Sequence, residues 1–233
     1  IIISPPEDIP DEPQVVCRIL HQSSATVHLR KPGQTHRQIA DYLKQVPVSY
    51  HPRIMVHGHQ RLLDRFDLMG IHFTEKDRMH DLQRLRRLRQ TQPGCRLSSA
   101  FHRIADIPEY DGLLDYILLS PIFDSVSKPG YQAAFDHSDL RRFLSRTEHT
   151  VIALGGVDVQ RAVTAASLGF KGIAVLGAVW QALPPEKAAR QLSTVCAERH
   201  WAGSTIDRRP LNRGSERIPR GLPRGGFNRE KRH

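Results

Sequence analysis

The sequence predicts an α/β protein whose eight parallel strands close into a (β/α)8 TIM barrel. Short β-branched runs alternate with longer amphipathic stretches over residues 1–202, and such alternation is typical of parallel strands covered by helices. Two glycine turns, 153-ALGGV-157 and 174-AVLGA-178, follow the last two predicted strands. In barrels this is a common place to bind a phosphate. A doubly wound open sheet is the competing architecture, and the close spacing of the repeat favours the barrel.

The strand predictions rest on apolar, β-branched runs, and they fall near residues 1–3, 25–29, 53–56, 70–73, 96–99, 115–119, 150–154 and 172–176. The helix predictions rest on apolar residues at helical spacing, and they fall near residues 11–21, 34–46, 59–67, 79–91, 102–110, 136–146, 158–168 and 178–199. Asp158 fits a helix N-cap and Gly169 a helix end. The loops must be short, because about 200 residues is the lower size limit for such a barrel.

The composition is that of a water-soluble globular protein. Of the 233 residues 39% are hydrophobic and 25% charged, and no apolar run approaches the roughly 20 residues that cross a bilayer. The first residues, Ile1 to Ile3, do not resemble a signal peptide. Cys17, Cys95 and Cys196 are far apart, which indicates a reducing compartment and no disulfide framework. We therefore expect a cytoplasmic protein without a membrane partner, and homo-oligomer formation stays open.

The basic charge lies mostly in the last residues. Residues 203–233 carry nine Lys or Arg and three Asp or Glu, so they contribute +6 of the chain's net +10. Their prolines and glycines cannot build a core, and we predict a disordered tail. A polyanion-binding arm and a solvated extension are the two interpretations. We favour the extension, so nucleic acid is not an expected partner.

Anion-binding side chains follow several of the predicted strands, which is where barrels carry their reactive residues. Arg30 and Lys31 follow the second strand, and Ser125, Ser127 and Lys128 follow the sixth. Arg offers phosphate a two-pronged donor and Lys offers it a mobile charge. Together with the glycine turns, these residues predict two phosphate-binding ends and therefore two phosphorylated substrates.

Histidines also lie in this set of loops. His57 and His59 flank Gly58 after the third predicted strand. Two ligands do not make a metal site, so we expect both to be polar loop residues near the substrate. His102 follows the fifth strand, and both a catalytic role and a role in orienting the next helix stay open.

The order of these segments resembles the thiamine-phosphate synthase family and its thiazole-tautomerase relatives, from residue 1 to about residue 195. The matching segments are 28-HLRKP-32, 70-GIHFTEKD-77, 120-SPIFDSVSK-128, 153-ALGGV-157 and 173-IAVLG-177. The resemblance implies a barrel enzyme that joins hydroxymethylpyrimidine diphosphate to thiazole phosphate. It also implies Mg²⁺ on the diphosphate, which leaves as thiamine phosphate forms.

The resemblance further implies the roles of individual residues. Arg30 and Lys128 take the leaving diphosphate, Ser127 is the third catalytic residue, and Asp77 binds Mg²⁺. The predicted substrate-binding residues are His28, Lys31, His57, Ser99, His102, Ser125, Gly155, Gly156, Leu176 and Gly177. Their physical task is to neutralise the charge that grows on the diphosphate and to hold the nucleophile in line.

The sequence departs from the family pattern at two places. Gly58 stands where the family has a second magnesium-binding Asp, and this loss motivates an alternative function. Pro121 stands where thiazole tautomerases carry a His, which argues against tautomerase chemistry by the usual route. One alternative is a paralogue that binds thiazole phosphate or thiamine phosphate without joining two substrates. The other is a nucleic-acid-associated protein that acts through its basic tail.

Overall fold

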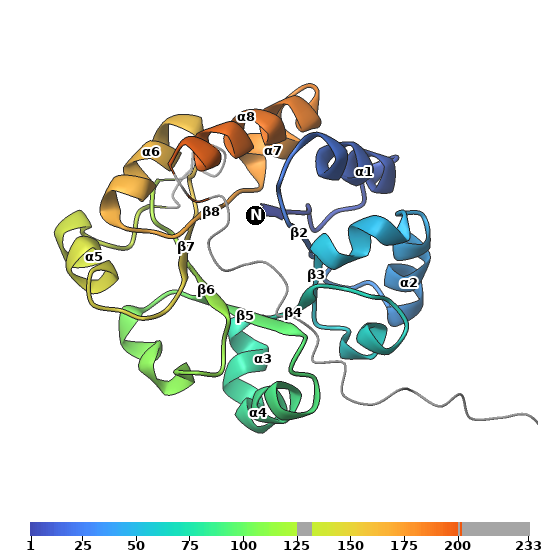
Figure 1. The fold of residues 1–233 in the computed structure, drawn as a ribbon, viewed down its shortest axis with the longest axis horizontal. Helices are drawn as coiled ribbons and strands as arrows, with labels where there is room; N and C mark the ends of the chain where they lie inside the picture. Colours follow the sequence, from blue (N-terminus) through green and yellow to red (C-terminus); the bar gives the residue numbers. More distant parts are fainter. Residues whose placement is uncertain (125–131, 200, 202–233) are drawn as a thin grey trace, which may run out of the picture.

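The computed structural model describes residues 1–124, 132–199 and 201. All eight strands form one sheet in the order of the sequence, and each strand runs parallel to the next. A parallel bridge between Ile2 and Val175 joins the two ends of the sheet. Figure 1 looks down the resulting ring, with the helices arranged around it. The expected (β/α)8 TIM barrel is therefore confirmed.

The strands of the ring are β1 (Ile2–Ile3), β2 (Val27–Leu29), β3 (Ile54–His57), β4 (Gly70–Phe73), β5 (Arg96–Phe101), β6 (Tyr116–Leu119), β7 (Val151–Leu154) and β8 (Ile173–Ala174). The helices are α1 (Glu12–Gln22), α2 (His36–Lys44), α3 (Glu75–His80), α4 (Leu82–Thr91), α5 (His137–Leu144), α6 (Val159–Leu168), α7 (Gly177–Trp180) and α8 (Pro185–Glu198). Each strand begins within two residues of its predicted start.

The outer layer departs from the predicted helices at four places. Residues 59–67 and 102–110 form short 3-10 turns instead of α-helices. The first connection must be short because β4 already begins at Gly70, and in the second Pro108 removes a backbone donor. Residues 79–91 are divided at Asp81, which ends α3 and caps α4 through a bond from Arg84 N. Residues 178–199 are also divided into two helices, since α7 ends at Trp180 and α8 begins at Pro185, after Pro184.

The core has two parts, because successive side chains of a strand point to opposite faces. The larger part lies between the strands and the helices. The smaller part fills the inside of the ring, and its buried members are Ile3, Met55, Met69, Tyr116, Leu118, Ile152 and Ala174. A polar group can therefore face either the barrel interior or the helix layer, and neighbours in the sequence differ in this respect.

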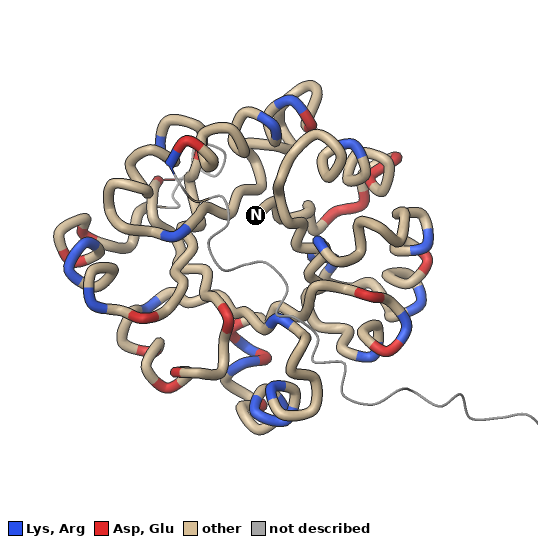
Figure 2. Tube along the Cα trace, viewed as in Figure 1, with Lys and Arg blue, Asp and Glu red and all other residues tan. Residues whose placement is uncertain are grey.

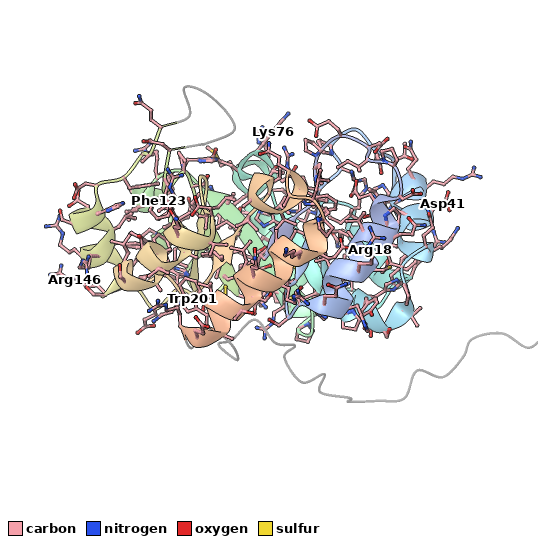
Figure 3. The ribbon with its side chains drawn as sticks, turned by 90° about the horizontal axis from the view of Figure 1, so that it is seen from above. Arg18, Asp41, Lys76, Phe123, Arg146 and Trp201 are labelled. Atoms are coloured by element: carbon pink, nitrogen blue, oxygen red, sulfur yellow. The ribbon has the colours of Figure 1, made fainter. Side chains whose placement is uncertain are left out.

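The strands end together on one face, because each runs parallel to the next. Lys76, which follows β4, lies at the upper edge of Figure 3, and Trp201, which follows α8, lies toward the lower one. Figure 2 shows basic and acidic residues interspersed over the ring of helices. None of the described helices combines the length and apolar character that a bilayer crossing requires. The predicted tail, residues 203–233, lies outside the described residues.

Candidate functional site

The structure brings the segments that follow the strands to one rim. Arg30 follows β2, His57 ends β3, and Gly155 follows β7. Parallel neighbouring strands place their carboxyl ends side by side, so residues more than 100 positions apart become neighbours of one opening. The rim is the candidate site, and its predicted members separate into those that face it and those that do not.

Arg30 has the position of an anion-binding residue. Its backbone is held by Ser4, whose Oγ accepts from Arg30 N at 2.8 Å and donates to Arg30 O at 3.2 Å. Within the described residues the guanidinium forms neither a hydrogen bond nor an ion pair. Its charge contributes to lowering the pKa values of His57 and His72, after burial as the main cause. Arg30 is thus a positive charge on the barrel side of β2 that has no anion among the described residues to neutralise it.

Lys31 points the opposite way. Its Nζ donates to a carboxylate oxygen of Glu12 and, at 2.6 Å, to Glu7 O, and both charged side chains of the pair are at least 98% buried. Tyr42 OH donates to the other oxygen of Glu12 at 3.1 Å. Burial raises the pKa of Glu12, and the bond from Lys31 acts against that rise. The structure therefore corrects the substrate-binding role predicted for Lys31: this residue joins β2 to α1.

Ser99 is a second predicted substrate-binding residue that faces the helix layer. Its hydroxyl donates to Phe73 O at 2.8 Å and accepts from Arg78 Nε at 3.1 Å. The Arg78 guanidinium is buried against the rings of Phe101 and Tyr110, 3.8 and 4.5 Å from their centroids. Ser99 thus holds β4, β5 and α3 together, and the structure does not bring it to the rim.

The β7 turn is shaped by close packing against the loop after β6. Gly155 and Gly156 have φ angles of +93° and +63°, a region that side chains disfavour. A Cβ on Gly156 would lie 2.4 Å from Asp124 O, and one on Gly155 would lie 2.8 Å from Pro121 Cα. Arg161 Nη1 donates to both Gly156 O and Asp124 O, at 2.7 and 2.8 Å. Backbone conformation and close approach both require glycine here, whatever this turn binds.

The turn after β8 lies beside the turn after β7, since β7 and β8 are paired. Leu176 precedes the four-residue helix α7, and Leu176 O accepts from Val179 N and Trp180 N at 3.1 and 3.0 Å. Trp180 Nε1 donates to Ile3 O at 2.9 Å, which ties this turn to β1. Both predicted glycine turns, at Gly155–Gly156 and at Leu176–Gly177, therefore lie next to each other on the rim.

Asp77 lies in the first turn of α3, just after β4. One of its carboxylate oxygens accepts from Thr74 Oγ1 at 2.7 Å, and its backbone N donates to the same hydroxyl at 3.2 Å. The other carboxylate oxygen forms no hydrogen bond within the described residues. Thr74 thus caps the helix, and Asp77 keeps one carboxylate oxygen available for another ligand.

His102 links the ends of two strands, since its Nδ1 lies 2.9 Å from Ser120 O. The remaining predicted residues of the β6 loop, Ser125, Ser127 and Lys128, lie outside the described residues. The described ends of that loop return to one place, where Asp124 Oδ1 accepts from Ala133 N at 2.7 Å.

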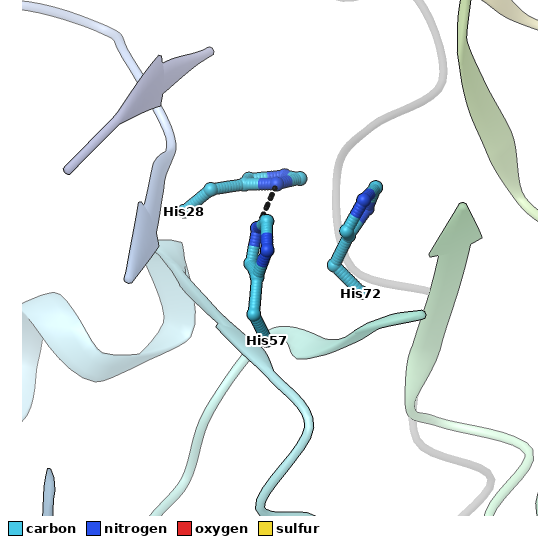
Figure 4. A group of neighbouring side chains, drawn as sticks. All are labelled: His28, His57 and His72. Atoms are coloured by element: carbon cyan, nitrogen blue, oxygen red, sulfur yellow. Dashed lines mark hydrogen bonds between the residues drawn. The ribbon is translucent and has the colours of Figure 1, made fainter. Parts of the chain in front are cut away.

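The most concentrated polar group of the barrel interior is a histidine trio, His28, His57 and His72, from the adjacent strands β2, β3 and β4. Figure 4 shows the three rings turned toward one another. His28 Nδ1 lies 3.2 Å from His57 Nε2, and the rings of His57 and His72 are 4.2 Å apart between centroids. Burial lowers the pKa values of all three, that of His72 to about 3. The three imidazoles are therefore neutral at pH 7.

Two hydroxyl groups hold the outer nitrogens of this trio. His28 Nε2 lies 2.6 Å from Tyr116 OH, and His72 Nδ1 lies 2.8 Å from Ser98 Oγ. His59 lies two positions after His57 in the sequence but does not join the trio. Its ring packs against that of His36, with 4.5 Å between the centroids. The trio was not predicted from the sequence, although strict alternation within β2, β3 and β4 places all three side chains on the same face.

Fold and site together define a (β/α)8-barrel protein. Within the described residues, its rim carries an arginine without a hydrogen-bond or ion-pair partner and two neighbouring glycine turns, and a histidine trio lies in the barrel interior. The chain belongs to the thiamine monophosphate synthase family, because the family model of that description matches residues 1–179.

Curated relatives are consistent with this membership. A thiamine-phosphate synthase of Chlamydia caviae is 28% identical over 203 residues, covering 84% of this chain and 93% of the relative. One from Escherichia coli is 27% identical, with 78% and 87% covered. A solved thiamine phosphate pyrophosphorylase from Bacteroides thetaiotaomicron has a TM-score of 0.69 at 22% identity, with 84% and 96% of the two chains covered. This last likeness concerns the fold.

Proposed function

We propose that the chain forms thiamine phosphate from hydroxymethylpyrimidine diphosphate and thiazole phosphate, with release of diphosphate. The observation that carries the proposal is the guanidinium of Arg30, unpaired among the described residues, on the same rim as the two glycine turns of a family member. One end of the rim thus offers a fixed positive charge, and the other offers backbone turns. This division suits two substrates that each carry a phosphate group.

Arg30 is the residue that we assign to the leaving diphosphate. Negative charge grows on that group as its bond to the pyrimidine breaks, and a cation already in place stabilises the change without reorganisation. Ser4 fixes the backbone of Arg30 through two hydrogen bonds, so the side chain starts from a rigid point. Lys128, which lies outside the described residues, is proposed as the second cation, beside Ser127.

The glycine turns are assigned to the thiazole phosphate. Gly156 follows β7 and Gly177 follows β8, and these two strands are neighbours in the sheet. Backbone N–H groups at such turns bind phosphate oxygens well. Ser125 is proposed to hold the thiazole side of the complex, and His102, at the end of β5, to contact the bound substrates.

Of the two positions where the resemblance implies a magnesium-binding carboxylate, this chain keeps one, at Asp77. Asp77 follows β4 at the rim, and one of its carboxylate oxygens has no hydrogen bond within the described residues. At the corresponding place after β3 the chain has Gly58, which has no side chain. Mg²⁺ is usually held by one or two carboxylates together with substrate phosphates and water. The ion would supply neutralisation of the diphosphate charge, and Asp77 would orient it.

The test is formation of thiamine phosphate by the purified full chain from both substrates with Mg²⁺. We expect Arg30→Met to lower kcat/KM about 100-fold, the size of effect expected for removal of one charge-stabilising donor. The matched control is Arg37→Met, because Arg37 is 93% exposed on α2 and should leave the rate unchanged. Asp77→Asn should raise the Mg²⁺ concentration that gives half of the maximal rate.

No product above background from the unaltered chain would exclude the synthase reaction. The second candidate is then a paralogue that binds thiazole phosphate or thiamine phosphate without joining two substrates. Gly58, with φ +72° and no carboxylate at the end of β3, is the observation that favours it. Calorimetric titration with each phosphate ester, in the absence of the diphosphate substrate, measures this binding directly.

A further inference from the structure

The histidine trio has the composition of a metal site. Each ring offers one nitrogen, and these three nitrogens all lie within 4.8 Å of one another. We propose that His28, His57 and His72 bind a divalent transition-metal ion of the Zn²⁺ type, with a fourth position open toward the rim. Imidazole nitrogens suit Zn²⁺, Co²⁺ or Ni²⁺ and do not suit Mg²⁺. This site is therefore distinct from the magnesium position proposed at Asp77.

The spacing of the nitrogens fits tetrahedral coordination. Zn–N bonds of about 2.0–2.1 Å place two ligand nitrogens roughly 3.3 Å apart. His28 Nδ1 and His57 Nε2 already lie 3.2 Å apart. The other separations in the trio are at most 4.8 Å, so the proposed coordination requires the rings to move closer together around the ion.

The outer nitrogens are engaged as they are in metal-binding histidines. Such ligands almost always bond through their second nitrogen to a neighbouring polar group, which fixes the ring and its tautomer. Tyr116 OH occupies Nε2 of His28 at 2.6 Å, and Ser98 Oγ occupies Nδ1 of His72 at 2.8 Å. The nitrogens that remain are Nδ1 of His28, whose hydrogen-bond partner is His57 of the same trio, and Nε2 of His72. An ion between the rings would take the place of the bond between His28 and His57.

Exposure indicates how an ion enters. His28 and His72 are buried, at 0% and 2% exposed, whereas His57 at the end of β3 is partly exposed. The open side of the trio is therefore the rim side, where Arg30 also lies close enough to act on His57 and His72.

The charges select the fourth ligand. Three neutral imidazoles leave the ion with its full double positive charge, and Arg30 adds another positive charge nearby. An anion is the complementary ligand, either hydroxide or a phosphate oxygen. A site with three protein nitrogens and one exchangeable position is also the usual form of a reactive zinc centre, whereas structural sites take four protein ligands.

The test is titration of metal-free, untagged full chain with Co²⁺, whose visible absorption reports four-coordinate nitrogen ligation, followed by displacement with Zn²⁺. We expect one ion per chain, displaced by Zn²⁺ and unaffected by millimolar Mg²⁺. His57→Asn should weaken binding at least about 100-fold, the upper end of the loss that even outer partners cause. The matched control is His59→Asn, two residues away. His59 has a φ of +51°, a conformation that Asn tolerates. This variant should bind Co²⁺ with the affinity of the unaltered chain.

Equal affinity in the unaltered chain and His57→Asn would overturn the proposal, as would equal losses in the two variants. If His57→Asn does not fold, ¹⁵N-histidine spectra of the unaltered chain decide. Zn²⁺ should shift the resonances of the trio and leave those of His59, and unchanged trio resonances would show a metal-free hydrogen-bonded cluster. The titrations contain no substrate, so their outcome is independent of the proposed synthase reaction.

Discussion

At the residue scale, adjacent positions in a strand or just after it have opposite surroundings. Arg30 faces the barrel without a partner among the described residues, and Lys31 is buried in an ion pair with Glu12. Ser98 bonds to His72 inside the barrel, whereas Ser99 bonds to Arg78 in the helix layer. A list of residues that follow each strand does not separate these pairs, because the direction of each side chain depends on the pleat of the strand.

The buried histidines predict a specific dependence of stability on pH. The pKa of His72 is lowered from 6.5 to about 3 in the folded chain, and it returns toward 6.5 on unfolding. Between these values unfolding takes up a proton, so stability is complete above pH 6.5 and is lost as the pH falls toward 3. We expect His72→Gln to flatten this slope by up to about 1.4 kcal/mol per pH unit.

Urea unfolding at about pH 7 and about pH 5 in metal-free buffer measures the effect, because the first value lies above the slope that a lowered histidine pKa creates and the second lies on it. His80→Gln controls for removal of an imidazole, because His80 is exposed on α3. An equal slope in the unaltered chain and in His72→Gln would show that His72 does not have the lowered pKa.

At the scale of elements, the rim is held by contacts between loops as well as by strands. The turn after β7 packs directly on the loop after β6, through Gly155, Gly156 and the bridging Arg161. Some predicted helices failed at this scale, since residues 59–67 and 102–110 became 3-10 turns. The apolar residues of those segments indicated burial, but they did not determine the type of helix. The short distance to the next strand in the first segment and Pro108 in the second favoured 3-10 turns.

Gly156→Ala tests the contact between these loops. The new Cβ meets both an unfavourable φ of +63° and Asp124 O at 2.4 Å, so we expect a loss of about 3 kcal/mol or more in the free energy of unfolding. Gly33→Ala is the matched control, because its φ is +93° but no atom lies within 4 Å of the place that a Cβ would occupy. It should cost about 1–2 kcal/mol. Equal losses, measured by denaturant unfolding, would contradict the packing argument.

At the scale of the whole molecule, closure of the sheet brings the site together. Arg30 follows β2, His72 lies in β4 and Gly156 follows β7, and only a closed ring of parallel strands places these three around one opening. All the described strands and helices lie within residues 1–198, and Trp201 Nε1 donates to Phe170 O at 2.9 Å.

Deletion of residues 203–233 is therefore expected to leave both the melting temperature and the rate of thiamine phosphate formation unchanged. Removal of the +6 segment should affect only binding to polyanions, if any occurs, through its salt dependence. Melting curves and salt-dependent binding to a nucleic acid check both statements. A steep salt dependence that disappears with the deletion would instead support the polyanion-binding arm, and a large fall in melting temperature would show that these residues contribute to the barrel.

The sequence by itself determined the eight alternating units, their parallel order and the segments of the rim, because these follow from local periodicity and turn residues. Only the tertiary structure decided which side chains share the opening. Lys31 and Ser99 turned to the helix layer, and His28, His57 and His72 met inside the barrel. The physical reason is that periodicity separates the two faces of a strand, whereas the register between strands and the closure of the ring determine which residues become neighbours.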